Sequence, residues 1–101
     1  MDFQVRVTPG TVEVRLSGRM EFTDHDRLPD IVALLDEQGA RRLTLDMSDL
    51  TFIDSAGLGM LLILQDEAEQ RNIKLIVQKA AGDVRRSIEL ARLNEVITIE
   101  Y

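Results

Sequence analysis

The spacing of apolar residues changes repeatedly along this chain between a period of two and the helical spacing of three or four. Residues 3–7 alternate apolar with polar, and the alternation resumes at 12–16 after Pro9 and Gly10. Two such runs joined by a Pro-Gly turn predict a β-hairpin, with Gly18 ending its second strand. Each strand then has one apolar and one polar face, as expected at a sheet edge that is covered on one side.

The rest of the chain predicts alternating helices and strands. Helical spacing favours a helix over 25–38 that Gly39 ends, and Pro29 is tolerable only in its first turn. The further elements are strands at 43–47, 73–77 and 96–99, a turn at 48–51, and helices at 58–70 and 84–91. The order β-β-α-β-α-β-α-β predicts one α/β domain over residues 1–101, with a mixed sheet begun by the hairpin and helices mainly on one face.

Composition narrows the class of function. A chain of 101 residues can bury one core, and its net charge of −6 opposes non-specific binding to nucleic acid or to anionic membranes. The absence of cysteine removes thiol catalysis, disulfides and cysteine zinc sites. The apolar run at 58–64 is too short to span a bilayer, and the first residues show no signal sequence. We therefore expect a cytoplasmic protein without metal or cofactor, whose partner is a protein or a small molecule.

The stretch 52–59 is the predicted functional site. The apolar pair Phe52 and Ile53 ends a strand and is followed by the acid Asp54, the hydroxyl of Ser55 and small residues, before a long apolar helix. Small residues let a partner approach the backbone closely, and a helix that begins here directs its unpaired N–H groups outward.

Catalysis by this site finds little support. The only histidine is His25, and Ser55 stands in Asp-Ser-Ala-Gly instead of a Gly-x-Ser-x-Gly elbow, so serine hydrolysis is disfavoured. Asp46, Asp49 and Asp54 could form a metal or phosphoacceptor cluster like that of response-regulator receivers. The simpler interpretation makes Asp46 a solvent-facing strand residue and Asp49 a turn former, and we prefer it. No enzyme is predicted.

Glycine spacing does not favour a nucleotide site either. Gly57 and Gly59 lack the spaced glycines and the lysine of a phosphate-binding loop. Their simplest structural role is close packing of the helix start against the preceding strand, and this role is compatible with partner binding.

The sequence Leu50-Thr-Phe-Ile-Asp-Ser-Ala-Gly-Leu-Gly59 resembles the signature of bacterial anti-sigma factor antagonists, members of the STAS domain family. Residues 14–18 and the acidic stretch after them resemble the second strand and loop of that family. Residues 84–88, followed by Leu93, resemble its last helix. The resemblance therefore covers nearly the whole chain.

This resemblance implies a regulatory mechanism. In the family, the serine directly after the aspartate is phosphorylated by a partner kinase that doubles as an anti-sigma factor, and a phosphatase reverses the modification. The corresponding residue is Ser55. The unphosphorylated protein is expected to bind this serine kinase, which has the histidine-kinase-like ATPase fold, and so to free the sigma factor, whereas the phosphorylated protein releases it.

The resemblance also implies a partner-binding surface. Its members are Glu21, Asp54, Ser55, Ala56, Gly57, Leu58 and Gly59. Glu21 stands where many family members have an aspartate thought to contact the kinase, and Ala56 replaces a second hydroxyl common in the motif. The alternative function is that of a STAS subunit in a membrane transport system for a lipid or an anion, docking on an ATPase or permease.

Overall fold

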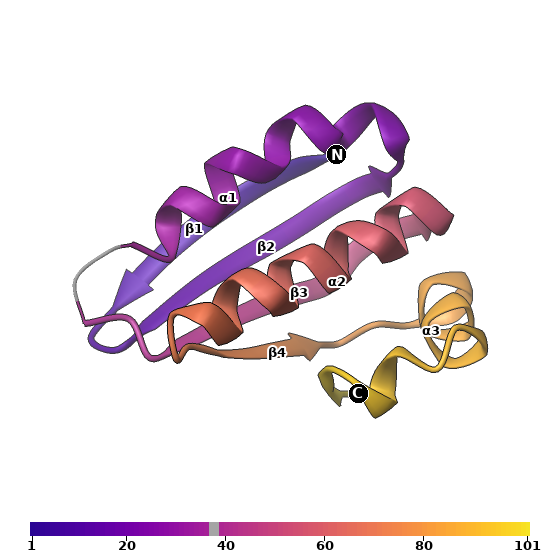
Figure 1. Ribbon diagram of the computed structural model, residues 1–101. Helices are drawn as coiled ribbons and strands as arrows, with labels where there is room; N and C mark the ends of the chain where they lie inside the picture. Colours follow the sequence, from indigo (N-terminus) through magenta and orange to yellow (C-terminus); the bar gives the residue numbers. More distant parts are fainter. Residues whose placement is uncertain (37–38) are drawn as a thin grey trace.

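The computed structural model describes residues 1–36 and 39–101, which form a five-stranded mixed sheet with helices packed against it (Figure 1). The strands are β1 (Asp2–Thr8), β2 (Thr11–Met20), β3 (Arg42–Ile53), β4 (Lys74–Gln78) and β5 (Thr98–Glu100). Their spatial order follows the chain, and only β1 and β2 are antiparallel to each other. The helical elements are η1 (Phe22–Arg27), α1 (Leu28–Leu34), α2 (Ser55–Gln70), α3 (Gly82–Leu90) and η2 (Leu93–Glu95). The predicted fold class and element order are confirmed.

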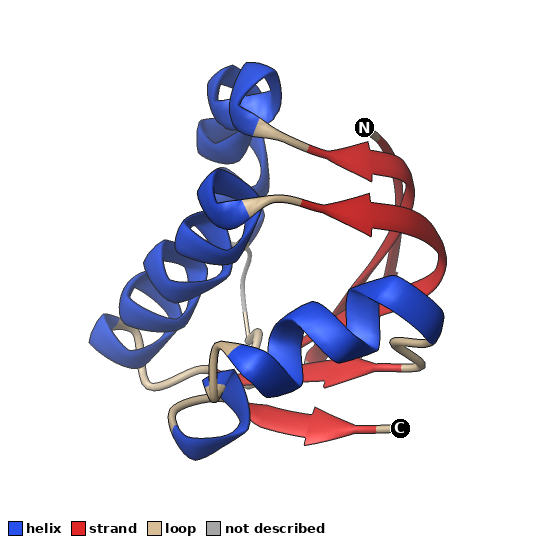
Figure 2. Ribbon diagram, turned by 90° about the vertical axis from the view of Figure 1, so that its right-hand side faces the viewer, coloured by secondary structure: helices blue, strands red, loops and turns tan. Residues whose placement is uncertain are grey.

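The strand register separates an apolar face of the sheet from a polar one. Val14 pairs with Leu45, and Leu45 pairs with Val77, so all three side chains point to the same face, where they are fully buried. Helices α1 and α2 lie side by side over this face (Figures 1 and 2). Val84 and Ile88 of α3 belong to the same buried cluster. The helices therefore cover the apolar face, as predicted.

Strand β3 is longer than predicted, because its polar residues form bulges and not a turn. It runs through 48–51 to Ile53, and β2 continues past Gly18 to Met20. The β2–β3 register shifts twice, and each shift places an extra residue on β3. At the first shift the Ser48 N–H donates to the Asp46 carboxylate, 2.9 Å away. Bulges use the same small polar residues and positive-φ glycine as turns do, so the sequence pattern was misleading here.

The predicted roles of Asp46 and Asp49 are wrong. Asp46 does point to the polar face, but it is only 5% exposed, and Lys79 Nζ lies 3.8 Å from its carboxylate. Burial raises the pKa of Asp46, but hydrogen bonds from Ser48 and the charges of Lys79 and Arg15 outweigh burial and hold it below its usual value. Asp49 lies within β3 and forms an ion pair of 2.9 Å with Arg15 on β2.

The first helical segment differs from the predicted helix at 25–38. A 3₁₀ segment, η1, precedes α1, and Pro29 occupies the first turn of α1, where its missing N–H costs nothing. Leu28, Ile31 and Leu35 form the predicted buried stripe. Helix α1 ends at Leu34, and residues 37 and 38 of the predicted helix lie outside the described residues.

The bounds of the C-terminal elements also differ from the predicted ones. The single turn η2 takes up Leu93–Glu95, so β5 begins at Thr98 instead of 96 and Val96 is exposed. Helix α3 begins at Gly82, before the predicted start at 84. In the described part of the chain, no helix has the length and apolar character that crossing a bilayer requires.

Candidate functional site

The predicted site lies where β3 ends and α2 begins. Asp54 has an extended backbone, and its Oδ1 accepts a hydrogen bond from the Gly57 N–H at 2.7 Å, so Asp54 caps the helix. This bond replaces the intrahelical partner that the first N–H groups of a helix lack. Helix α2 therefore begins at Ser55, before the predicted start at 58, and the Ser55 side chain lies on the surface.

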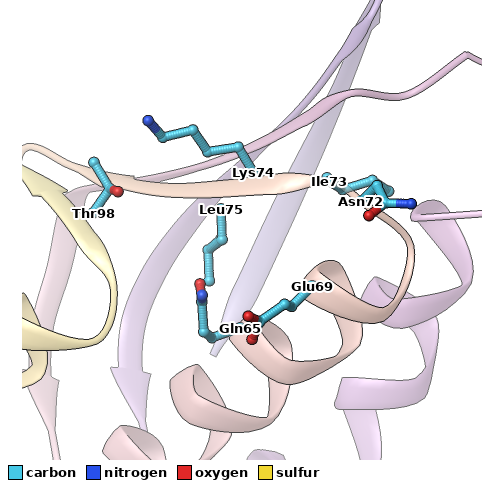
Figure 3. A pocket seen from close by; sticks show the side chains of 7 residues that line it. All are labelled: Gln65, Glu69, Asn72, Ile73, Lys74, Leu75 and Thr98. Carbon is cyan, nitrogen blue, oxygen red and sulfur yellow. The ribbon is translucent and has the colours of Figure 1, made fainter.

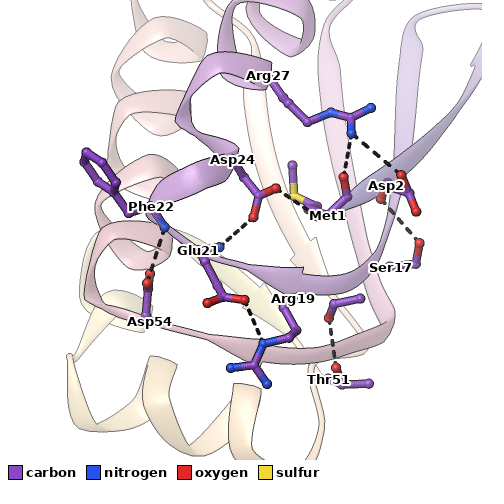
Figure 4. A network of polar contacts seen from close by, with 11 residues as sticks. Met1, Asp2, Ser17, Arg19, Glu21, Phe22, Asp24, Arg27, Thr51 and Asp54 are labelled. Carbon is purple, nitrogen blue, oxygen red and sulfur yellow. Dashed lines mark hydrogen bonds and ion pairs between the residues drawn. The ribbon is translucent and has the colours of Figure 1, made fainter.

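Asp54 also joins the end of β3 to the end of β2. Its Oδ2 accepts from the Phe22 N–H at 3.3 Å (Figure 4). The Asp54 N–H donates to the Met20 carbonyl at 3.2 Å. One carboxylate thus binds the start of α2 and the start of η1 together.

The loop that carries Glu21 is fixed by Asp24. Asp24 Oδ2 accepts from the Glu21 N–H at 2.8 Å, and Oδ1 lies 2.8 Å from the N-terminal ammonium of Met1 (Figure 4). The Glu21 carboxylate pairs with Arg19 Nε at 2.7 Å, and the Arg19 guanidinium lies 4.1 Å from the centre of the Phe52 ring. Glu21 is therefore held next to the start of α2 with its charge partly balanced.

The two glycines of the motif have different surroundings. Gly57 is buried, and a Cβ there would lie 2.5 Å from the Met20 carbonyl oxygen and 2.6 Å from Ile53 Cγ1. The predicted close packing of the helix start is confirmed at this position. Gly59 is different. Apart from its chain neighbours and the nearby backbone of α2, no heavy atom lies within 4 Å of the position that a Cβ would take. Close packing as an explanation for Gly59 is wrong.

An apolar surface that the sequence did not predict adjoins Ser55. Residues 55, 59 and 62 share one side of a helix, opposite the buried residues of α2. The helical spacing of the apolar residues predicts that Leu62 shares the covered face of this helix with Leu61, but Leu62 is 40% exposed. Phe22 is 71% exposed. The only sequence signal was that the apolar belt of α2 is wider than one buried face needs. We call Glu21, Phe22, Ser55, Gly59 and Leu62 the α2 surface.

A surface depression of the protein lies toward the other end of β3 from Ser55. An open depression between α2 and β4 is lined by Gln65, Glu69, Lys74 and Thr98, among others (Figure 3). Lys74 pairs with Arg42 at the start of β3, whereas Ser55 follows the end of β3. Within residues 1–36 and 39–101, no three His, Cys, Asp or Glu side chains are grouped so that they could hold a metal ion.

The chain belongs to the STAS domain family, whose family model matches residues 2–101. A STAS-domain containing protein of Pseudomonas aeruginosa (strain UCBPP-PA14) is 28% identical over 89 residues, which cover 85% of this chain and 84% of that protein. Both the match and the predicted family agree with the strand order and helix positions described above.

Solved structures with this fold include regulators and a transport protein. The anti-sigma factor antagonist SpoIIAA in its unphosphorylated form is 20% identical, with a TM-score of 0.74 over 99% of this chain and 87% of that chain. Its phosphorylated form from Bacillus is 21% identical, with a TM-score of 0.71 over 97% and 90%. A sulfate transporter family protein from Wolinella succinogenes is 20% identical, with a TM-score of 0.79 over 94% and 80%. At these identities the likeness shows the fold alone.

Alanine substitutions at Gly57 and Gly59 test which of the two positions is closely packed. We expect Gly57→Ala to lower the free energy of unfolding by about 1–3 kcal/mol, because its methyl group would overlap the Met20 carbonyl and Ile53. Gly59→Ala is the matched control and should raise stability by about 0.5–1 kcal/mol, because alanine is the better helix residue and has room there. Urea denaturation measures both. Equal effects of the two substitutions would contradict the described packing.

The acid stability of the protein should depend on Asp24. Burial raises the pKa of Asp24, but the Met1 ammonium, the Glu21 N–H and Arg27 outweigh burial and hold it below its ordinary value of 3.8. A carboxyl with a lowered folded-state pKa stabilises the fold above its ordinary pKa, and this contribution is lost as the pH falls through the folded-state value.

We therefore expect Asp24→Asn to lower the free energy of unfolding by about 1–3 kcal/mol at neutral pH. The difference from the wild type should shrink as the pH falls below 3.8, because the wild-type carboxyl then becomes neutral too. Denaturation curves across pH measure this, with the exposed Asp26→Asn as control. A difference that stays constant down to strong acid would contradict the assignment.

Proposed function

We propose that this protein is an anti-sigma factor antagonist that works by partner switching, with Ser55 as its phosphorylation site. The observation that carries the proposal is the position of Ser55, an exposed hydroxyl on a rigid helix start that is flanked by exposed Phe22 and Leu62. Large exposed apolar side chains on both sides of a site favour contact with another protein. A modifiable hydroxyl within such a surface can control that contact.

The modification would transfer the γ-phosphoryl group of ATP to Ser55 Oγ. The bond from the γ-phosphorus to ADP breaks, a bond to Oγ forms, and the hydroxyl proton passes to a base of the kinase. A phosphatase restores serine and releases inorganic phosphate by hydrolysis. The phosphoserine adds about 1.5–2 negative charges directly beside Asp54 and close to an apolar surface, so like-charge repulsion and desolvation oppose binding.

The proposed partners are a serine kinase of the histidine-kinase-like ATPase fold, which is also the anti-sigma factor, and a serine phosphatase. The partner-binding set Glu21, Asp54, Ser55, Ala56, Gly57, Leu58 and Gly59 is extended by Phe22 and Leu62. Within this set, buried Gly57 and the engaged carboxylate of Asp54 shape the surface from inside. We propose that the protein performs no catalysis itself and acts in the cytoplasm, and the two solved forms of SpoIIAA support this scheme.

Phosphorylation should occur at Ser55. After incubation with ATP and the serine kinase encoded in the genomic neighbourhood, mass spectrometry should find one phosphate on Ser55. Ser55→Ala should abolish it, while Ser48→Ala, at another exposed serine, should leave it unchanged. Ser55→Asp should weaken binding of the kinase at least about tenfold. Equal labelling of the wild type and Ser55→Ala would refute the site, and unchanged affinity of Ser55→Asp would refute the switch.

The apolar part of the α2 surface should contribute to affinity and not to stability. Phe22→Ser should leave the free energy of unfolding within about 0.5 kcal/mol, because the ring is exposed, and should weaken kinase binding by about 2 kcal/mol or more. Leu90→Ser is the matched control, since Leu90 is equally apolar and 75% exposed on α3. Isothermal titration calorimetry distinguishes them. Equal binding by both variants would remove Phe22 from the interface.

The alternative proposal is a STAS subunit of a membrane transport system that docks on an ATPase or permease. The fold match to a sulfate transporter family protein favours it specifically. Under this alternative, Ser55 need not be phosphorylated, and permease and ATPase genes should lie near the gene. A pull-down with the wild type and Ser55→Asp separates the two, because loss of a kinase supports switching, whereas retention of a permease or ATPase by both supports transport.

A further inference from the structure

Strand β1 is an edge of the sheet with unusual properties for an edge (Figure 1). It has seven residues, whereas β5 at the opposite edge has three. Val5 and Val7 point to the apolar face of the sheet but are 40% and 59% exposed. A long edge strand with exposed apolar side chains is a template for pairing with another strand.

The hairpin register shows which backbone groups of β1 point away from β2. Thr8 and Thr11 are partners across the two-residue turn, so they exchange both of their backbone hydrogen bonds. Because hydrogen-bonded pairs alternate along an antiparallel ladder, the even-numbered residues of β1 bond to β2. The N–H and C=O groups of Phe3, Val5 and Val7 therefore point outward. The register with β2 is continuous over all seven residues, so this outward row is regular.

We propose that this edge binds β1 of a second copy of the chain, antiparallel to it, about a two-fold axis at Val5. Val5 then lies opposite the partner's Val5, and Phe3 lies opposite the partner's Val7. All outward N–H and C=O groups of these residues pair across the axis. Side-chain alternation is preserved, so the two apolar faces form one continuous surface and the exposed valines gain cover.

The ends of β1 select this register. The Met1 carbonyl already accepts from Arg27 Nη1 at 2.9 Å, and it would lie opposite the partner's Pro9, which has no N–H to donate. A shift of two residues in one direction places Arg6 opposite the partner's Arg6, which is unfavourable for like charges. A shift in the other direction brings the partner's Val7 N–H to the Met1 carbonyl, which already accepts from the Arg27 guanidinium, so the partner strand would have to pack against that side chain.

The polar side of the strand favours a second copy as the occupant. In the proposed register, Gln4 lies opposite the partner's Arg6, with Asp2 on one diagonal of that arginine and Arg6 on the other. Diagonal neighbours in a sheet are within reach of a long side chain. The two-fold axis creates the pairing of Asp2 with the partner's Arg6 twice, and each Arg6 also faces a Gln4 amide. These acceptors outnumber the one diagonal contact between the two arginines, so a second copy fits this edge.

Sedimentation velocity over a wide range of protein concentration tests the dimer. The mass should rise from 11.4 kDa toward twice that value. Val5→Pro removes an outward N–H from each copy, and Val5→Lys places two like charges opposite each other. Each should raise the dissociation constant at least about tenfold, with thermal melting as the check on folding. Leu90→Lys makes the same chemical change at another exposed site and should leave the dimer intact.

A single introduced thiol tests the axis, because the chain has no cysteine. In a hydrogen-bonded antiparallel pair the Cα atoms are about 5.5 Å apart, within the range of about 4.4–6.8 Å that a disulfide bridges. Val5→Cys should therefore form a disulfide-linked dimer on mild oxidation, and Leu90→Cys should not. A wild type that stays at 11.4 kDa, a dimer that survives Val5→Lys, or association only with a different protein would overturn the proposal.

Discussion

The Asp54 carboxylate is the interaction on which the arrangement of the site depends. Strands β2 and β3 end side by side, with Met20 paired to Ile53, so a side chain directly after β3 can reach both of the segments that follow. One oxygen of Asp54 accepts from Gly57 in α2 and the other from Phe22 in η1. The sheet thereby sets the distance between the Ser55 hydroxyl and the exposed Phe22 ring, which belong to different helical elements.

The motif residues divide into those that build the junction and those that it presents. Gly57 belongs to the first group, because the backbone of α2 approaches Met20 too closely for any side chain. Ser55 and Gly59 belong to the second, since the hydroxyl is exposed and Gly59 faces open space. A sequence signature mixes both kinds of residue, and only the packing around each position separates them.

The order of the elements and the junction of β3 with α2 could be predicted from the sequence, because both depend on local periodicity and on cap chemistry. The predictions that were wrong concern features that depend on tertiary neighbours. Asp46 is buried because side chains such as Arg15 and Lys79 surround it, and the bulges of β3 contain the residues that a turn also uses. The prediction that Leu62 is buried was wrong because helical spacing defines an apolar stripe but not how much of that stripe other elements cover. Phe22 lies in a polar loop and has no periodic pattern at all.

The proposed effect of phosphorylation, which is weaker partner binding, follows from the contacts that Asp54 makes at the start of α2. A helix N-terminus normally attracts phosphate through unpaired N–H groups and its positive dipole end. Here the Gly57 N–H is bound by Asp54, and the same carboxylate offsets the dipole. A phosphate on Ser55 would thus gain less local stabilisation and would face the charge of its neighbour. Its additional charge therefore acts mainly on the surface shared with Phe22 and Leu62, where an apolar partner would have to exclude water.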